Sequence, residues 1–194
     1  MDGASRENIE MLGRFKQAFD ERRLLLHYQP KIRLADQRLV GSEALLRWRT
    51  AEGRDIPPGH FIPQVEQSSL IRTLTNWVIE QSLLQYMAWQ KEGIPCGPVA
   101  VNISPLNLLS RHFVSDIMHL LYKHGLDGDV LELEVTETAF MDDIQQSARK
   151  LLMLSREGIR ISIDDYGTGY SSLQYLDRLP VSALKLDRIF INKL

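Results

Sequence analysis

From residue 98 onward, short apolar segments alternate regularly with amphipathic segments, and few folds accommodate this order. The strand-like segments are 98–104, 130–135, 159–164 and 183–187, and the helical segments between them are 111–124 and 141–157. Gly125 and Gly158 end these two helices. Strands that alternate with helices are joined by crossover connections, so this part of the chain is predicted to form a mainly parallel sheet.

The first half of the chain reads as a helix, two strands and a second helix. The expected elements are a helix over 5–22, strands over 24–32 and 39–48 joined by a turn at 36–37, and a loop over 52–59. A long helix follows, which starts near Ile71 and ends before Gly93. No linker divides the chain, so a single domain is expected.

Each predicted strand has one aliphatic face and one face with a charged or amide group near its carboxyl end, because side chains alternate between the two faces. An open sheet with helices on both sides would need two apolar faces. A (β/α)₈-type barrel explains the pattern better, since its polar faces point into the lumen. Active sites of such barrels lie at the carboxyl ends of the strands. The residues expected to converge there are Glu43, Asn102, Glu134, Asp164, Asp165 and Lys185.

The converging residues favour a particular chemistry. Crowded carboxylates repel one another, so they need protons or a cation to coexist. Carboxylates with an amide oxygen are hard ligands that suit Mg²⁺, Mn²⁺ or Ca²⁺ better than zinc, and the set contains no His or Cys. The adjacent Asp164 and Asp165 could serve two ions, as in sites that activate water against a phosphodiester. Lys185 could position that water or offset phosphate charge.

Each of these residues also has an ordinary structural interpretation. Glu43 alone could be a solvated strand residue, and Asn102 could simply end a strand before a turn. Glu132 and Glu134 could form the solvated face of an antiparallel strand. The Gly-rich segment 167–172 could be a loop that closes over a metal or an ordinary turn. Their joint occurrence at corresponding strand ends favours a site.

Composition restricts partners and location. The chain of 194 residues carries 25 acidic and 23 basic side chains, which argues against broad electrostatic capture of polymeric nucleic acid or an anionic membrane. The lone Cys96 fits a reducing compartment. No apolar stretch approaches the roughly 20 residues that span a bilayer. We expect a cytoplasmic protein without membrane insertion.

Segment 43–48 (Glu-Ala-Leu-Leu-Arg-Trp) resembles the signature of the EAL domain family, the bacterial phosphodiesterases of cyclic di-GMP. Further short segments resemble the family in the same order along nearly the whole chain: 28–30, 61–63, 102–104, 134–137, 164–169 and 185–187. The resemblance implies a modified (β/α)₈ TIM-like barrel whose first strand is antiparallel.

The resemblance also implies residue roles. Metal ligands would be Glu43, Asn102, Glu134 and Asp164, with Asp165 at a second ion, and the catalytic set would be Lys185, Glu137 and Asp165. Lys185 would hold the attacking water, and Glu137 would order the loop at 166–172. Substrate contacts would come from Gln29, Leu45, Arg47, Pro63 and Asp187. The implied reaction hydrolyses cyclic di-GMP to linear pGpG with two Mg²⁺ or Mn²⁺ ions.

The sequence departs from the family pattern in some places. Tyr166 and Gln67 replace the usual phenylalanine and the common glutamate. Past the last matched strand, the family continues with a Glu-Gly-Val-Glu strand and a final strand, so residues 1–194 are expected to be one EAL-type domain that lacks the last two strands. The alternative function is a cyclic di-GMP receptor or protein-interaction module without hydrolysis. A homodimer and fusion to sensor domains are also expected.

Overall fold

The computed structural model describes residues 2–136, 139, 143–166 and 179–191. The helices are α1 (Asp2–Asp20), α2 (Ile62–Glu66), α3 (Leu70–Lys91), α4 (Pro105–Leu109), α5 (Phe113–His124), α6 (Ile144–Arg156) and α8 (Arg188–Ile191). The strands are β1 (Leu24–Ile32), β2 (Leu39–Arg49), β3 (Asp55–Ile56), β4 (Val99–Ile103), β5 (Leu131–Thr136), β6 (Arg160–Tyr166) and β7 (Ala183–Leu186). Two 3₁₀ turns, η1 (Pro58–His60) and η2 (Gly128–Val130), complete the description.

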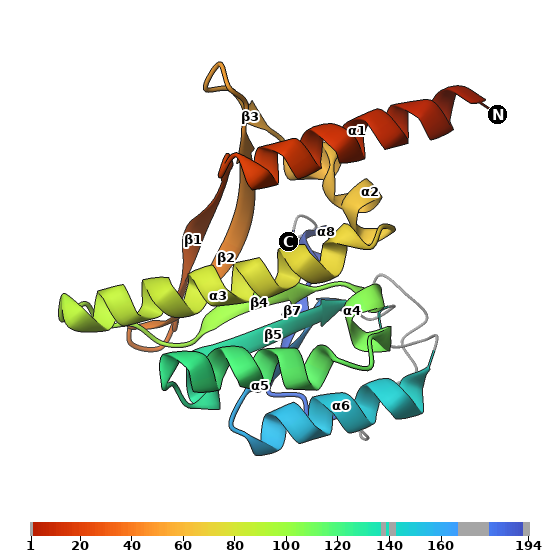
Figure 1. Cartoon of the computed structure of the whole chain (residues 1–194). Helices are drawn as coiled ribbons and strands as arrows, with labels where there is room; N and C mark the ends of the chain where they lie inside the picture. Colours follow the sequence, from red (N-terminus) through yellow and green to blue (C-terminus); the bar gives the residue numbers. More distant parts are fainter. Residues whose placement is uncertain (1, 137–138, 140–142, 167–178, 192–194) are drawn as a thin grey trace.

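The strands form one mixed sheet in the order β1-β2-β4-β5-β6-β7, with β3 paired to β2. The pairs from β2 through β7 along this path are parallel, as the alternation of strands and helices predicts. The β1–β2 pair is antiparallel, as the family resemblance implies. The neighbouring helices α3, α5 and α6 run side by side along one side of the sheet (Figure 1).

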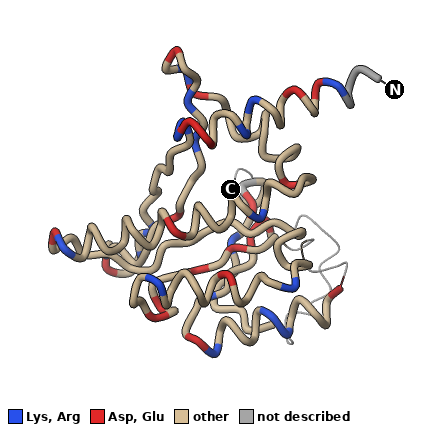
Figure 2. Tube along the Cα trace, viewed as in Figure 1, with Lys and Arg blue, Asp and Glu red and all other residues tan. Residues whose placement is uncertain are grey.

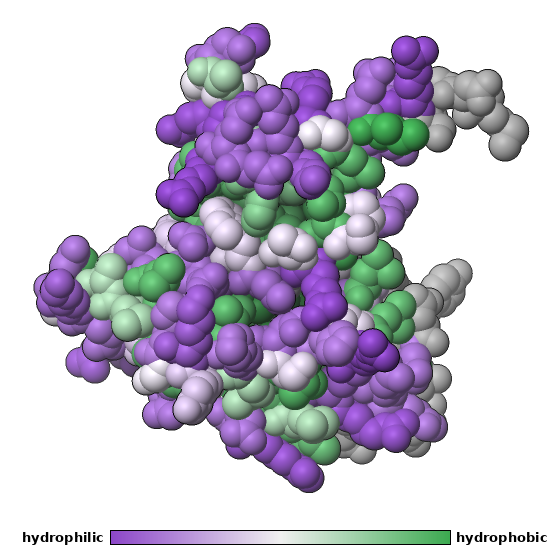
Figure 3. Space-filling model, in the orientation of Figure 1, coloured by the Kyte–Doolittle hydropathy of each residue, from purple (hydrophilic) through white to green (hydrophobic). Residues whose placement is uncertain are grey.

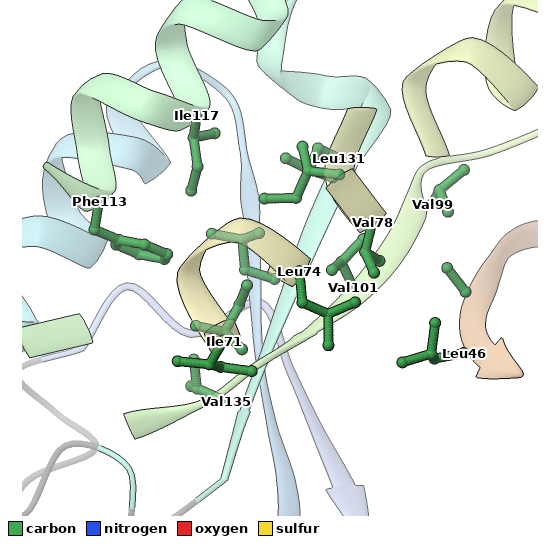
Figure 4. Packing of buried hydrophobic residues seen from close by; sticks show 14 of the residues in the cluster. Leu46, Ile71, Leu74, Val78, Val99, Val101, Phe113, Ile117, Leu131 and Val135 are labelled. Carbon is green, nitrogen blue, oxygen red and sulfur yellow. The ribbon is translucent and has the colours of Figure 1, made fainter. Parts of the chain in front are cut away.

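The aliphatic face of the sheet packs against these helices and forms the core. Val99, Val101 and Ile103 of β4 are at most 3% exposed, and so are Leu131, Leu133 and Val135 of β5. Figure 4 shows strand residues facing Leu74 of α3 and Ile117 of α5. Burying each such side chain contributes about 1.5–3 kcal/mol, so the period-two pattern of the strands determines which face the helices cover.

The other face of the sheet is strongly concave. The Nζ atom of Lys185 on β7 lies 3.2 Å from Oε2 of Glu43 on β2, although β4, β5 and β6 separate these strands in the sheet. Four strand spacings in a flat sheet would span about 19 Å, which is beyond the reach of the two side chains. The sheet therefore curls as in a TIM-like barrel, and its polar face lines the inside.

Short elements are where the structure differs most from the sequence-based expectation. The expected loop over 52–59 contains strand β3 and most of turn η1, and helices α2 and α4 were not expected. These elements have two to five residues, which is too short to display a periodic pattern. Ser104 is the N-cap of helix α4 and forms a capping box with Asn107.

The distribution of charge and the character of the helices agree with the composition. Figure 2 shows acidic and basic residues interspersed along the chain trace. Within the described part of the chain, no helix has the length and apolar character needed to cross a membrane.

Candidate metal and substrate site

Three carboxylates from three strands surround one ammonium group inside the concave face. Lys185 Nζ lies 3.2 Å from Glu43 Oε2, 2.5 Å from Glu134 Oε2 and 3.0 Å from Asp164 Oδ2. The register of the parallel strands places Asn102 beside Glu134, with Glu43 of β2 two residues before that level and Asp164 of β6 two residues after it. The curvature of the sheet brings these staggered side chains together in the lumen. The structure thus brings together the acids that the strand pattern predicted to converge.

Glu134 is at the centre of this cluster. Its side chain has no solvent exposure, and its second oxygen, Oε1, lies 2.7 Å from Nζ of Lys31. Burial raises the pKa of the Glu134 carboxyl, while the ion pairs with Lys185 and Lys31 oppose that shift. Burial alone would lower the pKa of Lys185, but the surrounding carboxylates, Glu134 first among them, raise it overall. A charged carboxylate can be buried here because both of its oxygens have cationic partners.

Asn102 and Gln29 extend the cluster beside Glu43. The Asn102 amide donates to Glu43 Oε1 over 3.0 Å. Gln29 of β1 lies directly opposite Glu43 in the antiparallel β1–β2 pair, so the two residues share the concave face. Gln29 is exposed, which leaves its amide accessible to a ligand in the lumen.

Asp165 differs from Asp164 in conformation and environment. Its φ of 54° lies in the left-handed region that residues other than glycine seldom adopt, and its backbone N–H donates to Asp164 Oδ1 over 2.9 Å. Burial and the neighbouring charges of Asp164 and Asp187 all raise the pKa of the Asp165 carboxyl. Asp187 Oδ1 in turn accepts from the backbone N–H of Ile189 at the start of α8. Strained residues of this kind are found preferentially at functional sites.

A largely apolar cavity of about 290 Å³ opens beside the carboxylates. Leu45, Arg47 and Asn102 line it from the strands, and α2 and α3 line it with aliphatic side chains and Glu66. Pro63 is exposed on α2 and lies outside this lining, in contrast to its neighbour Ile62. The cavity therefore contains two of the expected substrate contacts, Leu45 and Arg47, but not Pro63. A separate recess of about 580 Å³ lies between α1 and α3 (Figure 3).

Glu66 provides a pH-dependent test of this cavity. Burial raises the pKa of its carboxyl above the ordinary 4.5, so the unfolded chain releases this proton at a lower pH than the folded chain does. The stability associated with the protonated form is therefore full below about pH 4.5 and is lost as the pH rises through the folded-state pKa. Glu66→Gln should raise the melting temperature at pH 8 and leave it unchanged at pH 4. If the variant and the parent had equal melting temperatures at pH 8 as well as at pH 4, the burial of Glu66 would be contradicted.

The donor set fits a hard divalent cation. Among the described residues, no three Asp, Glu, His or Cys side chains stand in a metal-binding arrangement, and the Lys185 ammonium lies between the acids. However, the carboxylates of Glu43, Glu134 and Asp164 already converge on a single positive charge. Their oxygens and the Asn102 amide are ligands that Mg²⁺ and Mn²⁺ prefer. The chemistry of the residues thus suits such an ion.

Sequence reasoning missed some contributors to the site. Lys31 and Ser162 were not singled out from the sequence. Glu132, interpreted above as a possible solvated strand residue, is instead buried, with 9% of the whole residue exposed. Its carboxylate accepts hydrogen bonds from both Lys31 and Ser162. A signal for Lys31 did exist, because it lies two residues after Gln29 and so shares its face. The predicted Glu137 and the segment 167–172 lie outside the described residues.

Two curated proteins of Pseudomonas aeruginosa resemble this chain in sequence. Over all 194 residues, the chain is 42% identical to the bifunctional diguanylate cyclase/cyclic di-GMP phosphodiesterase MucR of Pseudomonas aeruginosa, of which it covers 28%. It is 40% identical over 185 residues to the cyclic di-GMP phosphodiesterase NbdA of the same species, of which it covers 24%. The chain thus spans about a quarter of the length of these curated relatives.

Solved structures agree on the fold. A structure of the MucR phosphodiesterase in complex with c-di-GMP matches with a TM-score of 0.89 and 42% identity, over 95% of this chain and 74% of that chain. The FimX EAL domain of Xanthomonas citri in complex with c-diGMP matches with a TM-score of 0.84 and 26% identity, over 98% of this chain and 74% of that chain. The family model named EAL domain matches residues 13–194, and the chain therefore belongs to the EAL domain family.

Proposed function

We propose that this domain binds cyclic di-GMP and hydrolyses one of its two phosphodiester bonds, which yields linear pGpG. The observation that carries the proposal is the convergence of Glu43, Glu134 and Asp164 on one cationic position beside the cavity. Relatives named cyclic di-GMP phosphodiesterases support the choice of substrate. Burying a carboxylate such as Glu134 is costly, which favours a role for it beyond packing.

Glu43, Asn102, Glu134 and Asp164 would hold a first Mg²⁺ or Mn²⁺ ion, and Asp165 would hold a second. When bound, such ions lower the pKa of a water molecule and neutralise charge on the phosphate. The protein holds these oxygens close together before the substrate binds, which reduces the rearrangement of the side chains needed during the reaction. The raised pKa of Asp165 indicates a carboxyl that favours a second positive charge nearby.

Lys185 would act at the water and phosphate side of the site. Its ammonium lies among the ligand carboxylates, so it can donate to a nucleophilic water held there and offset charge that develops on the phosphate. Arg47 and Leu45 face the adjacent cavity, where the guanidinium suits a phosphate oxygen and the aliphatic surface suits a base. Gln29, opposite Glu43, would contact the dinucleotide from β1. Roles for Pro63, Asp187 and Glu137 in substrate binding and loop ordering stay predictions.

Turnover by the purified 1–194 chain tests the proposal. Incubation with cyclic di-GMP and Mn²⁺ should release pGpG, detected by chromatography, and chelation with EDTA should stop the release. Calorimetric binding of cyclic di-GMP in Ca²⁺ provides the parallel measurement. Binding without pGpG would reject hydrolysis by this chain and leave the receptor function, for which the FimX domain solved with c-diGMP is the structural precedent.

The wider setting of the domain is also proposed. The curated relatives are about four times longer than the matched region, which supports a role for residues 1–194 as one domain of a longer signalling protein. Homodimer formation and a cytoplasmic location stay predictions. The molar mass of the purified chain in light scattering would test the first of these.

A further inference from the structure

Lys31 joins the site from the first strand and lies on the opposite side of Glu134 from Lys185. Its Nζ atom is 3.0 Å from Glu132 Oε1 and 2.7 Å from Glu134 Oε1. The Glu132 oxygen also accepts from the Ser162 hydroxyl over 2.7 Å. The side chain of Lys31 is 27% exposed, and those of Glu132 and Glu134 are 12% and 0% exposed. These contacts form a second layer of charge beneath the cluster around Lys185.

The antiparallel direction of β1 explains how Lys31 reaches β5. Because β1 runs against the other strands, its carboxyl-terminal part lies near the start of β2, where Lys31 pairs with Gly41. On the concave face of β4, two residues further along the strands than Gly41, Ala100 pairs with Glu43 of β2 and with Glu132 of β5. Two small residues in succession leave room for a lysine to cross the lumen. A larger side chain at position 41 would also collide with the Pro98 carbonyl, 2.8 Å from an added Cβ.

The two lysines divide the oxygens of Glu134 between them. Lys31 contacts Oε1 and Lys185 contacts Oε2, so the carboxylate plane is held from both sides. We infer that Lys31 is a positioning residue, which retains Oε1 and thereby presents Oε2 alone toward the site for a divalent cation. The inference rests on the proposed function, because it concerns how Glu134 would act as a metal ligand. Partners of this kind commonly change metal affinity by 10- to 100-fold when removed.

A role of Lys31 in neutralising charge predicts a different experimental result from a positioning role. If Lys31 served only to balance the charge of Glu132, replacing both residues with neutral ones would remove the need for it. The double variant Lys31→Met with Glu132→Gln makes this change and conserves net charge, so long-range repulsion of a cation is also balanced. Only the hold on Glu134 Oε1 is then lost. Lys123→Met with Glu80→Gln is a matched control, because it removes an ion pair of 2.6 Å between α5 and α3.

Mn²⁺ titration by calorimetry is the measurement, with melting temperature as the readout of folding. The Lys31→Met, Glu132→Gln variant should bind Mn²⁺ about tenfold more weakly than the parent or the control. Parent-like Mn²⁺ affinity in the folded variant would overturn the role of Lys31. A parent chain that binds no Mn²⁺ would overturn the proposed function and this inference with it.

A crystal structure of the parent with Mn²⁺ covers the case in which the variant does not fold. Lys31 Nζ should remain within hydrogen-bonding distance of Glu134 Oε1, and Oε2 should be the oxygen on the ion. A Glu134 carboxylate that binds the ion through both oxygens, or a Lys31 turned away from it, would overturn the inference.

Discussion

Glu134→Gln should reduce hydrolysis of cyclic di-GMP by about a thousandfold, because one neutral amide would replace the buried carboxylate shared by both lysines. The amide would place an NH₂ group where one lysine now has an oxygen acceptor. The substitution therefore removes both the negative charge and one of the two hydrogen bonds from the lysines. Mn²⁺ affinity should fall with the rate, since the proposed ligand set loses its most buried oxygen donor. The effect is expected to be large because Glu134 has no solvent exposure and therefore no water to compensate.

The measurement is the initial rate of pGpG release at saturating Mn²⁺. Circular dichroism of the variant separates a lost site from a lost fold. Glu157→Gln is a suitable control, because Glu157 is exposed just after the end of α6. This substitution removes the same charge, but from the surface. A Glu134→Gln rate within tenfold of the parent would refute the proposed ligand role.

Lys185→Met should make the stability of the protein depend on a divalent cation. Without Lys185, the carboxylates of Glu43, Glu134 and Asp164 would face one another with no ammonium between them. Loss of one partner of a buried pair costs about 3–5 kcal/mol, and the 29% exposure of Lys185 reduces the expected loss of unfolding free energy to roughly 2 kcal/mol. Turnover should also fall by roughly 100-fold or more, as expected for loss of a positioned cationic donor that stabilises charge on the phosphate.

Urea denaturation with EDTA and with Mn²⁺ measures this dependence. In EDTA the variant should be less stable than the parent, and Mn²⁺ should restore a larger part of stability in the variant than it adds to the parent. Lys123→Met is the control, since its ion pair is exposed and its loss should change stability by less than about 1 kcal/mol. Equal stability of Lys185→Met and the parent in EDTA would mean that the carboxylates do not repel one another as the geometry indicates.

Much of the fold was predictable from local patterns. The alternation after residue 98 predicted the helices α5 and α6 and the parallel strands, and the structure confirms these elements with small shifts at their ends. The aliphatic faces of β4 and β5 are buried as period-two patterning requires. Helices α2 and α4 were missed because five residues contain too little periodicity.

The candidate site was predictable only in part. Asn102 and Glu134 pair directly on adjacent parallel strands, so the register alone brings them together. Asp164 instead pairs with Thr136, two residues beyond Glu134, and it reaches the cluster only through the stagger and curvature of the sheet. By contrast, nothing in the sequence indicated that Pro63 would lie outside the cavity or that Glu132 would be buried against Ser162. These outcomes depend on the packing of α2 and on the closeness of β5 and β6.

The amino-acid sequence by itself determined the order of the elements, the face of each strand that is polar, and the carboxylates at the strand ends. These are local properties, set by the periods of strands and helices. Only the tertiary structure decided that the sheet curls enough for Lys185 to reach Glu43, and that Lys31 crosses over Gly41 to hold Glu134. Spacing along a chain does not specify distance across a lumen, because that distance depends on the curvature accumulated over several strands.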